Sequence, residues 1–166
     1  MTTGEKKDPS IGLAEIPGDF SATLGGDDGA VPVPWRASYA ISLSVVDGVR
    51  LMYVIDHAAL TPWAWRVPVD AVRRQAVARM ALSAGVLSRG DDRPASSDGG
   101  YRWLRMTAFG RSGQRVLPVV GSDEDAALAN AFHALIPASV WQLLAERRAE
   151  FLAGAASDGG TQRGER

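Results

Sequence analysis

Alternating apolar and polar positions are clearest in residues 39–56, where two β-rich runs flank the dipeptide Asp47-Gly48. This dipeptide favours a two-residue hairpin turn, because glycine reaches positive φ without a steric penalty. Counting outward from the turn pairs Leu43 with Met52. The resulting face carries Tyr39, Ile41, Leu43, Val45, Met52 and Val54. The second run is apolar on both faces, which predicts a strand inside a sheet.

A second hairpin is predicted from Tyr101–Phe109 and Gln114–Val120, with residues 110–113 (Gly-Arg-Ser-Gly) as the turn. Pro118 has no N–H to donate, so its strand should be an edge strand or end at this point. Alternation divides the first strand into one face with Tyr101, Trp103, Arg105, Thr107 and Phe109 and another with Arg102, Leu104, Met106 and Ala108.

Three segments show helical spacing of their apolar residues. The first covers about Val69 to Ser83 and ends before Gly85, which favours a helix C-terminus. The second begins after Ser122, whose hydroxyl can accept the N3 amide, and its first turn holds three acids that favour the positive end of the helix dipole. Pro137 breaks that run, and a last helix is predicted over residues 138–153.

The element order is therefore ββ-α-ββ-αα, which predicts an α+β fold: a mainly antiparallel sheet built from two β-hairpins, with helices packed on one face. The ends of the chain differ from this core. Residues 1–34 are poor in large apolar side chains and predict a disordered or loosely attached acidic arm. Residues 35–153 form the single predicted domain, with a mobile loop at 88–100, and 154–166 form a disordered tail.

Composition limits the function classes. The 166 residues are 46% hydrophobic and contain no cysteine, which excludes disulfides, thiol catalysis and thiolate metal sites. The net charge of −1 supplies no global field for nucleic acid or an anionic membrane. Two lysines and six acids give residues 1–34 a net charge of −4, whereas fourteen arginines and eleven acids give residues 35–153 a charge of +3. No apolar run reaches about 18 residues, so we expect a soluble, cytoplasmic protein.

Catalytic and metal motifs are weak. The two histidines, His57 and His133, show no metal-ligand spacing, and the sequence predicts neither a metal site nor a cofactor. A nucleophile elbow at the second hairpin fails because Gln114 replaces the final glycine of G-x-S-x-G. No catalytic residue is assigned. An enzyme or small-ligand binder using Asp56, His57 and the arginines of the second hairpin is kept as the alternative.

Cationic and aromatic residues interleave in the second hairpin, where Arg102 and Arg105 alternate with Tyr101 and Trp103. This mixture is typical of platforms for single-stranded nucleic acid, although no RNP or KH motif accompanies it. The main interpretation is core aromatics with solvated arginines. A nucleic-acid-binding module is the second alternative.

Two tryptophans stand out among the five in the chain. Trp63 and Trp65 lie between Pro62 and Pro68, and they share one face if the segment is extended. Large aromatic rings in such a connection either cover the core or anchor a partner. The predicted partner-binding residues are Trp63, Trp65, Arg102 and Arg105.

One stretch of about 30 residues resembles a known layout. Residues 53–56 (YVID), a polar link, residues 67–70 (VPVD) and a helix opening at residues 74–78 (RQAVA) are similar to small bacterial domains of unknown function with a secretion-chaperone-like α/β fold. The resemblance implies a non-enzymatic, protein-binding domain. The use of 16 arginines against 2 lysines fits a GC-rich bacterial genome.

The function expected from the sequence is that of a small intracellular bacterial protein-binding domain without catalytic activity. An adaptor, a chaperone-like factor and an immunity-type protein all fit this description. The partner is another protein, and a homodimer stays open.

Overall fold

The computed structural model describes residues 15–27, 36–55, 62–89, 101–118 and 122–160, with side chains up to residue 154 except that of Arg89. Its strands are β1 (Ser21–Asp27), β2 (Ala37–Ser44), β3 (Gly48–Ile55), β4 (Trp63–Val67), β5 (Tyr101–Ala108) and β6 (Arg111–Leu117). They form one sheet in the order β4-β3-β2-β1-β5-β6, and every neighbouring pair is antiparallel. The predicted α+β class with an antiparallel sheet is confirmed.

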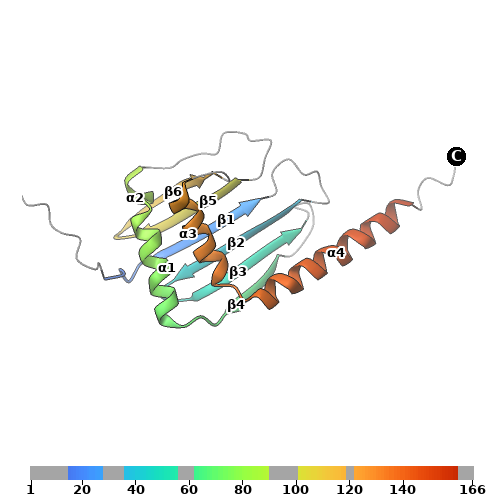
Figure 1. The fold of residues 1–166 in the computed structure, drawn as a ribbon, viewed down its shortest axis with the longest axis horizontal. Coiled ribbons are helices and arrows are strands. Elements are labelled where there is room, and N and C mark those ends of the chain that lie inside the picture. Colours follow the sequence, from blue (N-terminus) through green and yellow to red (C-terminus); the bar gives the residue numbers. More distant parts are fainter. Residues whose placement is uncertain (1–14, 28–35, 56–61, 90–100, 119–121, 161–166) are drawn as a thin grey trace, which may run out of the picture.

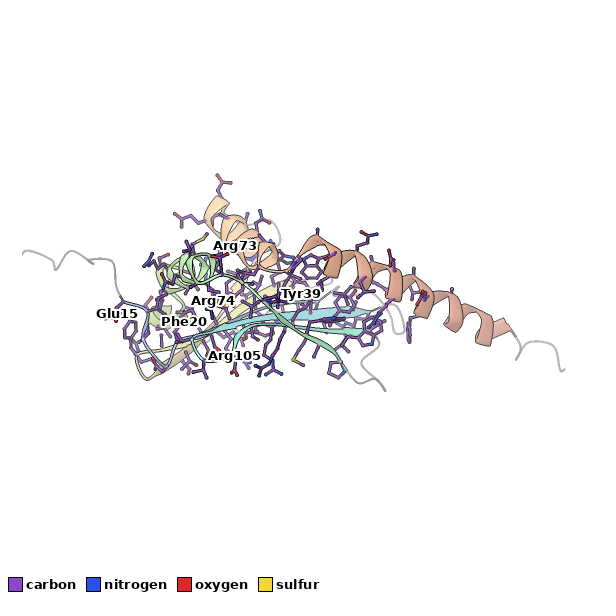
Figure 2. All side chains as sticks on the ribbon, turned by 90° about the horizontal axis from the view of Figure 1, so that it is seen from below. Glu15, Phe20, Tyr39, Arg73, Arg74 and Arg105 are labelled. Atoms are coloured by element: carbon purple, nitrogen blue, oxygen red, sulfur yellow. The ribbon has the colours of Figure 1, made fainter. Side chains whose placement is uncertain are left out.

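The helices are α1 (Ala71–Ser83), α2 (Val86–Arg89), α3 (Asp123–Ala134) and α4 (Ala138–Gly160). Helices α1 and α3 lie side by side across one face of the sheet, and α4 runs from the edge near β4 past the ends of the strands (Figure 1). Seen along the sheet, all the helices lie on the same side (Figure 2). Helices therefore cover one face, as the sequence predicted.

The core lies between the sheet and the helices. Its largest fully buried side chains are Phe132, Leu24, Ile41, Leu51, Leu104, Met106, Leu117, Leu144, Val49 and Val86. At the start of α3, Ser122 caps the helix by accepting the Asp125 N–H, as predicted. Asp125 is the one buried charged residue in the described part of the chain, and Arg115 of β6 pairs with it at 3.0 Å.

Strand β1 corrects the predicted domain boundary. The sequence predicts residues 21–27 to belong to the loosely attached arm, yet they form a strand in the middle of the sheet, between β2 and β5. The strand holds few large side chains because its neighbours supply the bulk: the Trp103 ring lies against Gly25, and the Tyr39 ring lies against Gly26. Of the rest of the predicted arm, residues 15–20 are described and include the buried Phe20, whereas 1–14 and 28–34 lie outside the described residues.

The first hairpin forms, but its predicted register is wrong. Leu43 pairs with Val49 rather than with Met52, and the connection is a three-residue loop, 45–47, followed by Gly48 at φ +74°. A shift by three residues moves every side chain of β3 to the other face. Leu51 is consequently buried and Met52 is 41% exposed. The observed register also keeps the charge of Arg50 in solvent, where it is not desolvated.

The two-residue turn lies in the second hairpin instead. Ala108 pairs with Arg111, and the two residues between them, Phe109 and Gly110, both have positive φ, as a type I′ turn requires. The predicted turn at residues 110–113 is therefore wrong. The predicted faces of β5 are correct, because Leu104, Met106 and Ala108 are buried on one side. Strand β6 is an edge strand that ends before Pro118, as expected.

Helix positions were predicted better than their faces. Helix α1 starts after the N-cap Asp70, and Gly85 follows its end at φ +71°. Helical spacing predicts an apolar stripe of Val69, Val72, Ala76 and Met80. The buried residues are instead Val77, Ala78 and Ala81, and Val72 is 77% exposed. Residues 88–89 belong to α2, so the predicted mobile loop starts inside a helix, and its remainder, 90–100, lies outside the described residues.

Two further boundaries differ from the prediction. Residues 63–67 form the edge strand β4, which the predicted element order does not contain. Helix α4 continues to Gly160, so the first part of the predicted disordered tail is helical, and residues 161–166 lie outside the described part.

Among the described helices, none alone has the length and apolarity to cross a membrane, and α3 with α4 meets that test only as a pair bent by 86°.

Candidate functional site

The four predicted partner-binding residues lie on two different faces of the sheet. Strand register puts Arg102, Gly26, Tyr39, Tyr53 and Trp63 in one row across the helix-covered face. Trp65 belongs to the next row of that same face. Arg105 projects from the opposite side, away from the helices (Figure 2). The structure therefore does not bring the four residues together.

Trp63 and Trp65 share a face, as predicted, and both contact other parts of the chain. The Tyr53 ring stacks on Trp63 with centroids 6.1 Å apart and planes inclined by 8°. The Arg147 guanidinium of α4 lies 5.4 Å from the Trp63 ring and 5.7 Å from the Trp65 ring. Cation–π contacts of this kind attach α4 to the edge strand β4. The role of Trp63 and Trp65 in binding a partner stays a prediction.

Tyr39, His133 and Trp141 form a polar and aromatic cluster between β2, α3 and α4. The Tyr39 hydroxyl and His133 Nε2 are 2.8 Å apart, and the Trp141 indole N–H donates to the His133 carbonyl at 3.4 Å. The imidazole stacks on Trp141, with centroids 5.1 Å apart. These contacts join the two helices to the sheet.

Burial sets the protonation of this cluster. Desolvation raises the pKa of Tyr39, and the positive charge of Arg102 acts in the opposite direction. Desolvation lowers the pKa of His133, and Arg102 lowers it further, because a second cation is unfavourable nearby. Both side chains are consequently neutral near pH 7. Their mutual hydrogen bond joins β2 to α3.

The enzyme alternative depended on Asp56 and His57, which lie outside the described residues. Its other members, the arginines of the second hairpin, point in different directions. Arg102 and Arg115 are on the helix-covered face, whereas Arg105 is on the other. In the part of the chain that the structure describes, no three His, Asp or Glu side chains gather as metal ligands.

The second face of the sheet is the better candidate interface, because no helix in the described part of the chain covers it (Figure 2). We call this surface the open face. Register places two side-chain rows next to one another on it. The basic row holds Gln114, Arg105, Thr23, Ser42, Arg50 and Arg66. The apolar row holds Val116, Trp103, Gly25, Ala40, Met52 and Ala64.

Trp103 is fixed in the apolar row by its neighbours. Its ring lies so close to Gly25 that a Cβ there would be 2.1 Å from the indole. The Arg105 guanidinium lies 5.5 Å from the ring centroid and donates to the Gln114 side-chain oxygen at 3.0 Å and 3.3 Å. The indole is thus held flat on the sheet beside a positioned cation, while Met52 remains 41% exposed.

Arginines dominate the charge of the open face. Arg50, Arg66 and Arg105 are exposed, and the one acidic residue that the described strands contribute to this face is Asp27. Asp27 already pairs with Arg36 at 3.0 Å. Arg66 lies 3.6 Å from Asp47 in an exposed pair, which offsets little of its charge. The surface is therefore positive next to an apolar band.

Sequence reasoning found Arg105 but missed Arg50 and Met52. The predicted register put Met52 on the same face as Leu43, and so hid it from any surface assignment. The signal that could have corrected this was Arg50 itself. In the predicted register Arg50 lies on the same face as Leu43, whereas a charged side chain in the middle of a strand belongs on the solvent face.

Comparison with known proteins adds no family: no protein-family model matches the chain, and no curated protein matches it.

Proposed function

We propose that this chain is a protein-binding domain whose open face holds an acidic, partly apolar segment of another protein. The observation that carries the proposal is the pair of adjacent rows, one with Arg50, Arg66 and Arg105 and one with Trp103 and Met52. Trp, Met and Arg are enriched at the buried centres of protein interfaces. A preorganised indole and guanidinium lose little conformational freedom on binding.

The spacing of the arginines defines the partner further. Arg105 and Arg50 belong to β5 and β3, which are three strand positions apart in the sheet. Neighbouring strands are separated by about 4.8 Å, so the two side chains start about 14 Å apart. An extended segment that crosses the strands covers this distance in about four residues. Acidic residues four positions apart, with apolar residues between them, fit both rows.

A protein fits the open face better than single-stranded nucleic acid does. Base stacking needs free aromatic faces, and Arg105 already lies over the Trp103 ring. The apolar row also supplies small aliphatic side chains, Ala40 and Ala64, that have no counterpart in a phosphate-binding groove. The resemblance to secretion-chaperone-like domains supports the same function. We extend the proposal to a bacterial, cytoplasmic adaptor, chaperone-like or immunity-type protein.

The proposal is tested by affinity capture from a nuclease-treated lysate of the organism that encodes the chain. Wild-type protein is compared with an open-face variant, Arg50→Glu with Arg105→Glu. The control is Asn130→Glu with Ala145→Glu, which adds two negative charges at exposed positions of α3 and α4 that belong to neither row of the open face. We expect one acidic protein to be retained by wild type and control and lost by the open-face variant.

The captured protein is then purified and titrated against each variant. Retention that survives both open-face substitutions contradicts the proposal, and so does retention that nuclease treatment abolishes. Thermal unfolding of each variant checks that the sheet is intact. We expect melting temperatures close to that of the wild type, because substitutions at exposed positions usually change stability little.

A further inference from the structure

A cavity of about 330 Å³ lies at the end of the sheet opposite the projecting half of α4, between α1, the end of β2 and the segment before β1. Its lining residues are Glu15, Ile16, Phe20, Leu43, Ser44, Val45, Ala71, Arg74, Gln75, Ala78 and Arg79. Glu15, Phe20 and Arg74 are seen around this region in Figure 2. The cavity is on the helix side, and none of its lining residues belongs to the basic row or the apolar row of the open face.

The lining combines apolar walls with a small set of charges. Phe20, Leu43 and Ala78 are buried and form the apolar part, and Ile16 is half-buried beside them. The charged lining residues are two arginines and one glutamate, a formal balance of +1. A pocket with apolar walls and a few polar groups is the usual form of a small-molecule site.

Arg74 is the unusual member of this lining. Its Nε is buried without a hydrogen-bond partner, and no ion pair to its guanidinium exists in the described part of the chain. The same side chain also lines a second cavity, of about 430 Å³, next to Gly48 and Val67. Arg74 as a whole is half-buried, and a buried N–H without a partner is unfavourable, so an anion that accepts from this Nε removes that penalty.

Arg73, the neighbour of Arg74 on α1, has different surroundings. Arg73 donates to the carbonyl of Ala134 at 2.6 Å, at the end of α3. Arg73 thus has a structural partner outside the cavity, and Arg74 has none in the part of the chain that the structure describes. Two adjacent cations on one helix have different surroundings, which gives a matched comparison.

We propose that this cavity binds a small amphipathic monoanion: a carboxylate carried on an apolar body of several carbons. The carboxylate contacts the guanidinium groups of Arg74 and Arg79, and the apolar body lies against Phe20, Leu43 and Ala78. The formal balance of +1 matches a single negative charge, and Glu15 at the cavity disfavours a dianion such as a phosphate monoester. Planar guanidinium groups bind carboxylates through paired hydrogen bonds.

Cavity size limits the apolar body. Small-molecule sites commonly span about 300–1,000 Å³, so this one is at the lower end of the range. A single short alkyl or aryl group fits, whereas a two-chain lipid does not. The same chemistry occurs in a free medium-chain acid and in the C-terminus of a peptide that ends in a large aliphatic residue.

The experiment measures binding of four probes to the full chain by isothermal titration calorimetry. Octanoate is compared with octanamide, and N-acetyl-Leu-Leu with a free carboxyl group is compared with its C-terminal amide. We expect the acids to bind saturably and each amide to bind about ten- to hundredfold more weakly, because the charge-assisted hydrogen bonds are lost. The acid with the higher affinity identifies the source of the ligand.

Three variants assign the binding to the cavity. Arg74→Gln should weaken binding of the better acid at least tenfold, whereas Arg73→Gln should leave it unchanged. Glu15→Gln, at an exposed position that does not endanger folding, should strengthen binding about two- to fivefold by removing a nearby negative charge. Equal binding of acid and amide, no saturable binding of either acid, or a loss of affinity in Glu15→Gln would overturn the proposal.

Discussion

The Tyr39 hydroxyl lies 2.8 Å from His133 Nε2, and this contact joins the middle of the sheet to helix α3. The two rings meet edge to face at 73°, with their centroids 4.9 Å apart. Trp141 covers the imidazole from α4. This hydrogen bond thus lies where β2, α3 and α4 meet. The protonation states of Tyr39 and His133 therefore affect how these three elements pack.

Stability should therefore depend on pH through this pair. Burial lowers the pKa of His133 below 6.5, so the unfolded chain takes up a proton that the folded protein resists. Stability should fall as the pH decreases through 6.5 toward the lowered value. Burial raises the pKa of Tyr39 above 10.0, so stability should also fall as the pH rises past 10.

Urea unfolding at pH 7.5, 5.5 and 10.5 measures the loss of unfolding free energy on the acid limb (pH 7.5 to 5.5) and on the alkaline limb (pH 7.5 to 10.5). His133→Gln should reduce the loss on the acid limb, and Tyr39→Phe should reduce the loss on the alkaline limb. An acid limb of the same slope in His133→Gln would show that other groups cause it.

Close approach of Trp103 makes Gly25 intolerant of any side chain. A Cβ at position 25 would be 2.1 Å from the indole, so Gly25→Ala should destabilise the domain by about 1–3 kcal/mol. Gly18→Ala is the control, because no atom lies within 4 Å of its Cβ position. Chemical denaturation measures both. Trp103→Leu should reduce the cost of Gly25→Ala if the clash is the cause.

Strand β1 should be essential to the fold although its sequence is rich in glycine. Leu24 is 0% exposed, so Leu24→Ala should cost about 2–5 kcal/mol in unfolding free energy. Val46→Ala removes an apolar side chain that is 85% exposed and should change stability by less than about 0.5 kcal/mol. Similar small effects of both substitutions would place residues 21–27 outside the core.

The turn at Phe109-Gly110 stores strain that a substitution can release. Phe109 has φ 55° and is 60% exposed, and side chains with a Cβ disfavour this conformation, asparagine least. Phe109→Asn should therefore stabilise the domain by about 0.5–1 kcal/mol in thermal unfolding. Val45→Asn, at an exposed loop position of the other hairpin, is the comparison and should give no gain.

The carboxylate of Asp19 supports the same turn from a distant part of the chain. It accepts the N–H groups of Phe109 at 3.0 Å and Gly110 at 2.7 Å, and these bonds lower the pKa of Asp19. A carboxylate with a lowered pKa stabilises the fold above its unfolded value of 3.8, and this stability is lost as the pH falls below that. Asp19→Asn should therefore lower the melting temperature at pH 7 and leave it unchanged near pH 2.

Local sequence patterns identified most of the elements of this fold and failed where distant contacts decide. The strands of both hairpins, the cap at Ser122 and the helix end before Gly85 follow from nearby residues. The register of β2 and β3 does not follow from nearby residues, because Asp47-Gly48 is compatible with two different connections. Burial of Leu51 and exposure of Arg50 select the observed one. Strand β1 could not be predicted from its own residues, because the large side chains that pack against its glycines, Trp103 and Tyr39, belong to other strands.

The two candidate sites were harder to predict for the same reason. The open face combines residues from six strands, so one wrong register removes Arg50 and Met52 from it. The cavity at Arg74 joins α1, β2 and the segment before β1. Nothing in the local sequence around position 74 indicates that its Nε has no hydrogen-bond partner among the described residues. Trp63 and Trp65 were correctly placed on a shared face, and the cation that covers both comes from Arg147, more than eighty positions away.

The most direct test of the central claim is an NMR footprint of the captured partner on this domain. Methyl-labelled methionine and indole ¹⁵N signals are recorded before and after the partner is added. If the open face is the interface, the Met52 methyl and the Trp103 indole shift, while the Trp63, Trp65 and Trp141 indoles stay in place. Shifts confined to those three indoles, with Met52 and Trp103 unchanged, would contradict the account.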